Sequence, residues 1–153
     1  MRRLAPLLLP LLLGGCLLYR SSAGVETSGQ LLIRTAEGDA TLSVEIADTL
    51  DERTKGLMDR GSLAPDAGMV FLWREPTDTT FGMQDTFIPL SIAFWDEDDR
   101  IVGILDMQPC EAALCPSYAS PVPSAGAVEV NQGWFAEHGV EVGDRVELTT
   151  AGA

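Results

Sequence analysis

Positive charge is scarce in this 153-residue chain, where 10 lysines and arginines stand against 23 aspartates and glutamates. The formal net charge is −13, and it becomes −15 if Arg2 and Arg3 are removed with an N-terminal leader. Such a surface repels phosphate groups, so nucleic acid is not an expected partner. The single lysine, Lys55, fits either a GC-rich genome or adaptation to salt.

Groups that commonly carry catalysis are also few. His138 is the only histidine, and it lies at the end of a short expected helix, where histidine more often caps carbonyl groups. No serine lies in a nucleophile-elbow pattern, and no glycine-rich phosphate loop is present. The sequence therefore favours a non-catalytic protein without a cofactor.

The N-terminus resembles a bacterial lipoprotein signal peptide. Met1 to Arg3 is a positive start, and Leu4 to Leu13 is an apolar run too short to span a bilayer. Leu13-Gly14-Gly15-Cys16 resembles the lipobox, in which the cysteine is acylated and becomes the first residue. We expect a signal peptide over residues 1–15 and a tether over 16–29. The alternative is an ordinary signal peptide with an incidental cysteine.

Acylation of Cys16 would anchor the protein in a membrane, because several lipid chains hold a protein durably. The expected location is the periplasmic face of the cell envelope, with the membrane and an unknown envelope ligand or protein as partners. Leu17, rather than aspartate, follows the cysteine. By resemblance to enteric sorting rules, this favours the outer membrane.

Two further cysteines, Cys110 and Cys115, remain if Cys16 carries lipid. An even remainder in an exported protein favours a disulfide, here closing a short loop worth about 2 kcal/mol on the loop-entropy model. The competing interpretation is a metal or redox pair. The four intervening residues differ from redox C-x-x-C spacing, and there is no second ligand pair for zinc.

Alternating apolar patterns dominate residues 30–150, which we expect to form one domain. Thr49 and Glu52 match a capping box before a short helix ending near Met58, and a helical turn is expected over Trp134–His138. The segment from Pro109 to Pro123 is expected to be irregular. The predicted fold is mainly β, a small antiparallel open barrel or jelly-roll-like sandwich with one or two short helices. Its seven expected strands are residues 30–35, 40–47, 68–73, 90–95, 100–107, 127–130 and 145–149.

Several short motifs occur in order over Ser43 to Glu147. They are Gly56–Arg60, Gly68–Phe71, Phe81–Thr86, Ile88–Phe94, Pro109-Cys110, Cys115–Tyr118, Val128–Gly133 and Gly143-Asp144. In this order and at these spacings, the set resembles the domain-of-unknown-function 192 family of bacteria and archaea. The resemblance implies a small β-barrel or jelly-roll-like domain and no established activity.

The chain departs from the family pattern in two places. The usual F-W-M-K-N-T segment is replaced by Phe81–Thr86, which has no tryptophan, lysine or asparagine, and Ser91 replaces an aspartate. The lost cation and the gained Asp85 shift the expected preference toward neutral or positive ligands.

The main functional hypothesis is a non-catalytic binding domain whose cleft lies near Arg60, Met83, Gln84, Asp85 and Thr86. Arg60 is either an ion-pair partner of Asp85 or another acid, or a fork that binds a ligand carboxylate.

Two alternatives belong to other classes. One is a small hydrolase or lyase that uses Asp85 with Arg60 as an electrostatic stabiliser. The other is periplasmic copper(I) binding by thioethers, although methionine more often fills cores; the candidates are Met58, Met69, Met83 and Met107. Asp96–Asp99 is expected to be a solvated hairpin turn, since it lacks the spaced ligands of a calcium loop.

If Cys16 is acylated, the protein should be recovered in the membrane fraction of the cell. Cys16→Ala should move it from the membrane fraction to the soluble periplasmic fraction and abolish palmitate labelling, because the acylated thiol is lost. Cys110→Ala, which leaves Cys16 intact, is the control and should stay in the membrane fraction. Equal labelling of Cys16→Ala and the unaltered chain would contradict the assignment.

Overall fold

The computed structural model describes residues 27–112 and 114–150. The leader, Cys16 and most of the proposed tether lie outside these residues, so the signal peptide and lipidation stay predictions. The chain order is β1 (Thr27–Arg34), β2 (Asp39–Ala47), α1 (Leu50–Lys55), β3 (Ala67–Thr77), β4 (Thr80–Gly82), β5 (Leu90–Trp95), β6 (Ile101–Met107), β7 (Ser117–Ala119), β8 (Ser124–Asn131), α2 (Trp134–Glu137) and β9 (Arg145–Thr150).

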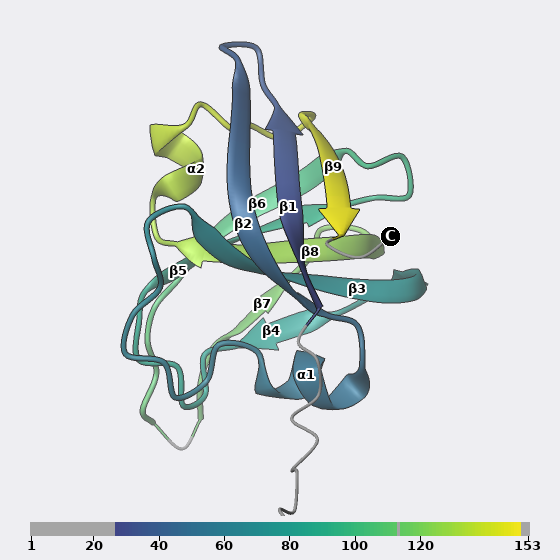
Figure 1. Ribbon diagram of the computed structural model, residues 1–153. Helices are drawn as coiled ribbons and strands as arrows, with labels where there is room; N and C mark the ends of the chain where they lie inside the picture. Colours follow the sequence, from purple (N-terminus) through teal and green to yellow (C-terminus); the bar gives the residue numbers. More distant parts are fainter. Residues whose placement is uncertain (1–26, 113, 151–153) are drawn as a thin grey trace, which may run out of the picture.

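The prediction of a mainly β fold with two short helices is confirmed. Seven strands form one sheet in the order β6-β5-β8-β3-β2-β1-β9, and β4 pairs with β7 in a second, small sheet. In Figure 1, β1, β2 and β9 stand upright while β3, β5 and β8 run across behind them. The barrel is not closed: the end strands β6 and β9 approach at the isolated bridge between Arg100 and Arg145.

One strand pair corrects the all-antiparallel expectation. β2 and β3 are parallel, with Ser43 opposite Ala67 and Ala47 opposite Phe71. The reason is the connection between them, which contains α1. Parallel neighbours need a crossover rather than a hairpin, and a helix commonly supplies it. The predicted capping box is present at the start of this helix, with Thr49 as N-cap and Glu52 at its third position.

The boundaries differ from the prediction mainly at strand ends. β1 begins at Thr27 rather than Gln30, and β3 continues to Thr77 through an irregularity after Leu72. β4 and β7 were not predicted, and β7 interrupts the segment expected to be irregular. Among the described residues, no helix has the length and apolar content needed to cross a bilayer.

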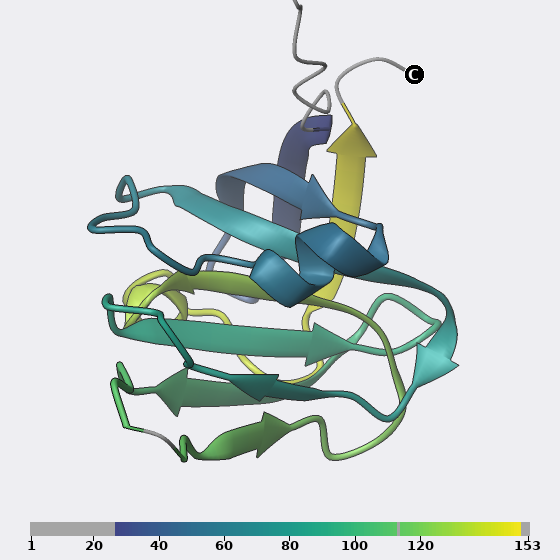
Figure 2. The same ribbon diagram turned by 90° about the horizontal axis from the view of Figure 1, so that it is seen from below.

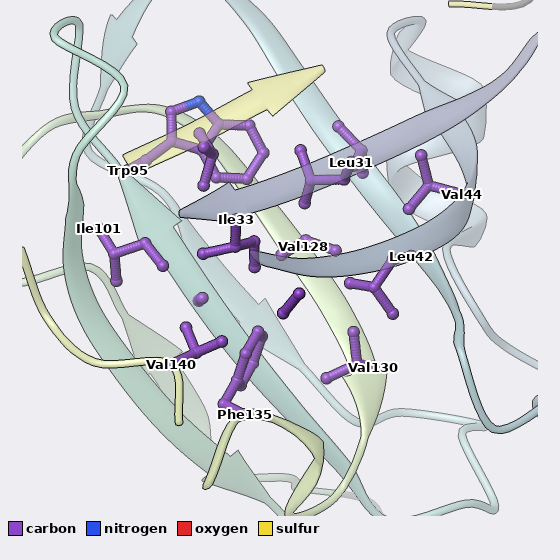
Figure 3. Packing of buried hydrophobic residues seen from close by; sticks show 14 of the residues in the cluster. Leu31, Ile33, Leu42, Val44, Trp95, Ile101, Val128, Val130, Phe135 and Val140 are labelled. Atoms are coloured by element: carbon purple, nitrogen blue, oxygen red, sulfur yellow. The ribbon is translucent and has the colours of Figure 1, made fainter. Parts of the chain in front are cut away.

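The first core fills the space between the two halves of the large sheet. Leu31, Ile33 and Leu42, from β1 and β2, face Val128 and Val130 of β8, and Figure 3 shows them closing on one another. Trp95, Ile101, Phe135 and Val140 complete this core, so α2 and its following turn seal one end. The strand predicted over residues 40–47 alternates as such strands do, with Leu42, Val44 and Ile46 inward.

A second core covers the other face of β3, β5 and β8. Its buried residues are Ala47, Leu57, Met69, Phe71, Met83, Leu90, Ile92, Phe94, Met107 and Ala127. β5 is therefore buried along its whole length, as strands with both faces covered are. This two-sided burial decides where the pocket described below can form.

Close approach of Trp95 to β8 predicts a stability effect. A Cβ built on Gly126 would lie 2.2 Å from Cζ2 of Trp95, its partner across the strands. Gly126→Ala should lower the free energy of unfolding by about 1–3 kcal/mol, the usual cost of overpacking, as measured by chemical denaturation. Gly61→Ala is the matched control, since open space surrounds that position. Equal effects of the two substitutions would show that the contact does not matter.

Candidate functional site

A cavity of about 360 Å³ opens between α1, β3, β4 and the segment that follows β4. We call it the α1 pocket. Its wall includes Phe71 and Trp73 of β3, Phe81 of β4 and Leu57 after α1. Figure 2 shows α1 in front of β3, on the side of the sheet that carries the second core.

The aromatic wall is held by edge contacts between rings. The ring centroid of Phe81 lies 5.0 Å from that of Phe71 and 6.1 Å from that of Trp73, both close to perpendicular. Phe81 also contacts Phe94 in the second core, at 5.7 Å. Edge-to-face packing of this kind fixes ring orientation, so the pocket has a preformed apolar side.

Helix α1 forms the polar rim. Nη1 of Arg53 donates hydrogen bonds to the backbone oxygens of Asp48 and Leu72, the latter at 2.9 Å, which ties the helix to β3. Lys55 is exposed and also lines the pocket. Gly56 ends the helix at φ 47°, and a Cβ there would lie 3.4 Å from the Phe71 ring. Glycine therefore lets the helix end turn tightly against the aromatic wall.

Glu129 is the one acidic residue of the described lining, and it is only 5% exposed. It lies on β8 between Met69 of β3 and Ile92 of β5, on the face of the second core. Within the described residues, no hydrogen bond or ion pair reaches its carboxyl group. Burial raises the pKa of Glu129 to about 8, because the charged form loses its hydration.

Gln84 and Thr86, two of the five predicted site residues, line the α1 pocket. Thr86 is buried, and its hydroxyl donates a hydrogen bond to the backbone oxygen of Gln84 at 3.3 Å. Gln84 forms an isolated bridge with Cys110. The predicted disulfide between Cys110 and Cys115 is confirmed, with a Cα–Cα distance of 5.8 Å, and it braces this part of the wall.

The structure does not bring the other three predicted residues into the pocket. Arg60 pairs with Glu45 of β2 through two hydrogen bonds of 2.6 and 2.5 Å, and both side chains are 31% exposed. The acid that binds Arg60 is thus Glu45, one of the options left open by the sequence. Met83 is buried in the second core, and Asp85 is exposed.

Asp85 has a clear backbone role. Its φ is 53°, in the left-handed region that aspartate tolerates better than most residues. The turn it forms is closed by the amide of Thr86, which donates to the oxygen of Met83 at 3.1 Å. The oxygen of Asp85 in turn accepts from the amide of Asp59 at 2.8 Å. Asp85 therefore connects the segment after α1 to the segment after β4.

The remaining sequence candidates have structural positions. Of the four candidate methionines, Met69, Met83 and Met107 are buried in the second core, whereas Met58 is half-buried and lines the α1 pocket. His138 caps α2, with Nδ1 2.8 Å from the oxygen of Trp134, as expected for a helix end. Asp96 accepts two backbone amides in the hairpin turn before β6. Among the described residues, no group of three histidine, cysteine or acidic side chains forms a metal site.

Sequence reasoning missed Glu129 and the aromatic wall. Val128 and Val130 alternate with Glu129, a pattern that predicts a solvent-facing acid on a half-buried strand. The second core covers that face, so the acid is buried instead. One feature of the sequence could have indicated burial. Glu129 is the single charged residue in an otherwise apolar run, Ala127–Val130.

Comparisons with known proteins agree with this architecture. The model of the DUF192 family, described as "Uncharacterized ACR", matches residues 32–148. The chain is similar to a Sinorhizobium meliloti 1021 protein described as a candidate transcription regulator, with 32% identity over 80% of this chain and 95% of that one, and a TM-score of 0.73. A protein of unknown function from Novosphingobium aromaticivorans DSM 12444 shares 30% identity over 83% of this chain and 89% of that one, with a TM-score of 0.75. No curated protein matches the chain in sequence.

The buried acid predicts how stability depends on pH. The unfolded chain releases the Glu129 proton near pH 4.5, whereas the folded chain keeps it until about pH 8. Between these values the folded state binds more protons, so this group lowers stability as the pH rises from 4.5 to 8. Glu129→Gln should remove that decline, so its melting temperature should increasingly exceed that of the unaltered chain toward pH 8.

Glu97→Gln is the matched control, because Glu97 is exposed in the turn before β6. Melting temperatures of the three chains, measured at half-unit steps from pH 4.5 to 8.5, check the prediction. A Glu129→Gln curve parallel to that of the unaltered chain would show that Glu129 ionises normally.

Proposed function

We propose that this chain, which belongs to the DUF192 family, is a bacterial cell-envelope lipoprotein whose domain binds a small organic ligand in the α1 pocket. The envelope location rests on the lipobox-like Leu13–Cys16 and on the disulfide, a bond typical of oxidising compartments. Ligand binding rests on the pocket, which is the observation that carries the proposal.

The α1 pocket has the composition of a small-molecule site. Its volume of about 360 Å³ lies in the usual range, and aromatic side chains are combined with a few hydroxyl, amide and carboxyl groups. The apolar wall supplies contact area, and the polar groups of Thr80, Gln84 and Thr86 can orient a bound molecule. The walls come from rigid elements, since β3 and β8 lie in the centre of the sheet.

Binding fits this pocket better than catalysis. Covalent catalysis needs a nucleophile next to a base, which a third group orients. Among the described lining residues there is no histidine, cysteine or serine, and the hydroxyl groups belong to threonines. Asp85 and Arg60, the pair that a hydrolase or lyase would use, do not line this cavity.

The first described residue of the chain lies close to the end of β2, just before α1. Thr27, the first residue of β1, is opposite Ile46 at the end of β2, and β2 leads directly to α1. The regulator description of the Sinorhizobium relative is not extended to this chain, because a net charge of −13 disfavours DNA binding.

The proposal predicts that one substitution can block the site. Thr80 is exposed on β4 and lines the pocket, so Thr80→Trp should fill much of the cavity without disturbing a core. A fragment library, screened by thermal shift on the mature chain in detergent, should yield compounds that raise the melting temperature of the unaltered protein. These shifts should vanish in Thr80→Trp.

Thr41→Trp is the matched control, because Thr41 is also exposed but lies on β2 outside the pocket. It should keep the shifts. If no compound stabilises the unaltered chain, or if all compounds stabilise Thr80→Trp equally well, the pocket is not a binding site.

A further inference from the structure

We propose that the α1 pocket selects small organic cations, namely primary ammonium compounds with an aromatic or apolar body, through an ion pair with Glu129. This inference rests on the proposed function and names the ligand class of the same site. The ammonium group would contact the Glu129 carboxylate, while the apolar body packs against Phe71, Trp73 and Phe81.

The first support is that the Glu129 carboxyl group has no partner. Buried polar groups are almost always hydrogen-bonded, and an unpaired buried acid is costly. Glu129 is 5% exposed and lines the cavity, yet no partner reaches it within the described residues. A ligand in the cavity can therefore supply the missing partner.

The second support is the set of groups around it. The neighbouring strands contribute Met69, Phe71 and Ile92, which carry no charge. The described lining adds aromatic, threonine and glutamine side chains, and its other charged groups are Arg53 and Lys55 on α1. Nη1 of Arg53 donates to two backbone oxygens and Lys55 is exposed, and neither cation pairs with Glu129 within the described residues.

An organic cation fits better than a metal ion. A single carboxylate cannot provide the several oxygen ligands that a hard cation needs. An ammonium group needs one carboxylate and a few neutral acceptors, which Thr80, Gln84 and Thr86 provide. Aromatic faces attract cations as well. The negative charge of the whole protein also favours the approach of cations over anions.

Binding would be coupled to proton release. At neutral pH Glu129 holds its proton, since burial raises its pKa to about 8. An arriving ammonium ion favours the carboxylate, so the O–H bond of Glu129 breaks and the proton leaves to solvent, while the ligand keeps its own charge. Affinity for amines should therefore rise about tenfold per pH unit between pH 6 and 7.5.

The test uses three probes of similar size and different charge. They are 2-phenylethylamine, the neutral 2-phenylethanol and the anionic 3-phenylpropionate. Isothermal titration at pH 6, 7 and 8, in two buffers of different ionisation enthalpy, measures affinity and proton release together. The amine should bind at least tenfold more tightly than the alcohol at pH 8, and should release close to one proton at pH 7.

Two variants separate the charge of Glu129 from the shape of the pocket. Glu129→Gln should weaken amine binding at pH 8 at least tenfold and abolish its pH dependence, while alcohol binding stays the same. Gln84→Lys places an ammonium group in the same cavity and should weaken amine binding specifically. Glu97→Gln is the control for net charge, because it removes one exposed acid. It should change neither amine binding nor alcohol binding.

The outcomes separate the two proposals. Equal binding of amine and alcohol, or binding of the anion above both, overturns the cation inference but leaves the α1 pocket a ligand site. Amine binding that persists at full strength in Glu129→Gln also overturns the inference. Failure of all three probes while library compounds still bind overturns it as well. The proposed function itself is overturned by an empty library screen, or by library compounds that all stabilise Thr80→Trp as well as the unaltered chain.

Discussion

Burial of both faces of β3, β5 and β8 is the constraint on which the rest of the structure depends. One face closes the first core against β1 and β2, so the fold gains its stability there. The other face is covered by Leu57 after α1, by Met83 in the segment after β4 and by the disulfide-bridged loop. In a fold of two sheet layers alone, the outer face of β3, β5 and β8 would be exposed to water. Here the second core covers that face, so residues on it are buried.

The α1 pocket is a consequence of how that cover is built. The capping box starts α1 at a fixed point, and Gly56 turns the chain away against Phe71. Phe81 holds the opposite wall through its ring contacts, and the Gln84–Cys110 bridge ties that wall to the disulfide loop. These local features leave a space above Glu129 that the chain's own side chains do not fill, and its carboxyl group stays unpaired.

Much of the fold was predictable because local patterns agree with it. The alternation of β2, the capping box at Thr49 and the Cys110–Cys115 pair are local signals, and each has the expected structure. The parallel pairing of β2 with β3 and the small sheet were not predictable, because they depend on contacts between distant segments.

The site was predictable only in part, for the same reason. Gln84 and Thr86 were identified from a motif, and both line the pocket. Arg60 ends a second motif, Gly56–Arg60, and was predicted to lie beside the first. Its guanidinium instead binds Glu45 on β2. The alternation of its strand predicts that Glu129 faces solvent, but the second core covers that face and buries it. Its importance therefore comes from tertiary packing alone.

The most direct measurement is the ionisation of Glu129 itself. Carboxyl carbon-13 chemical shifts, with the signal assigned by its loss in Glu129→Gln, report the protonation of this one group across a pH titration. The account predicts a midpoint near pH 8 in the free protein and a clear downward shift when 2-phenylethylamine is bound. A midpoint near 4.5 in the free protein would mean that the carboxylate is already solvated or paired, and would contradict the account.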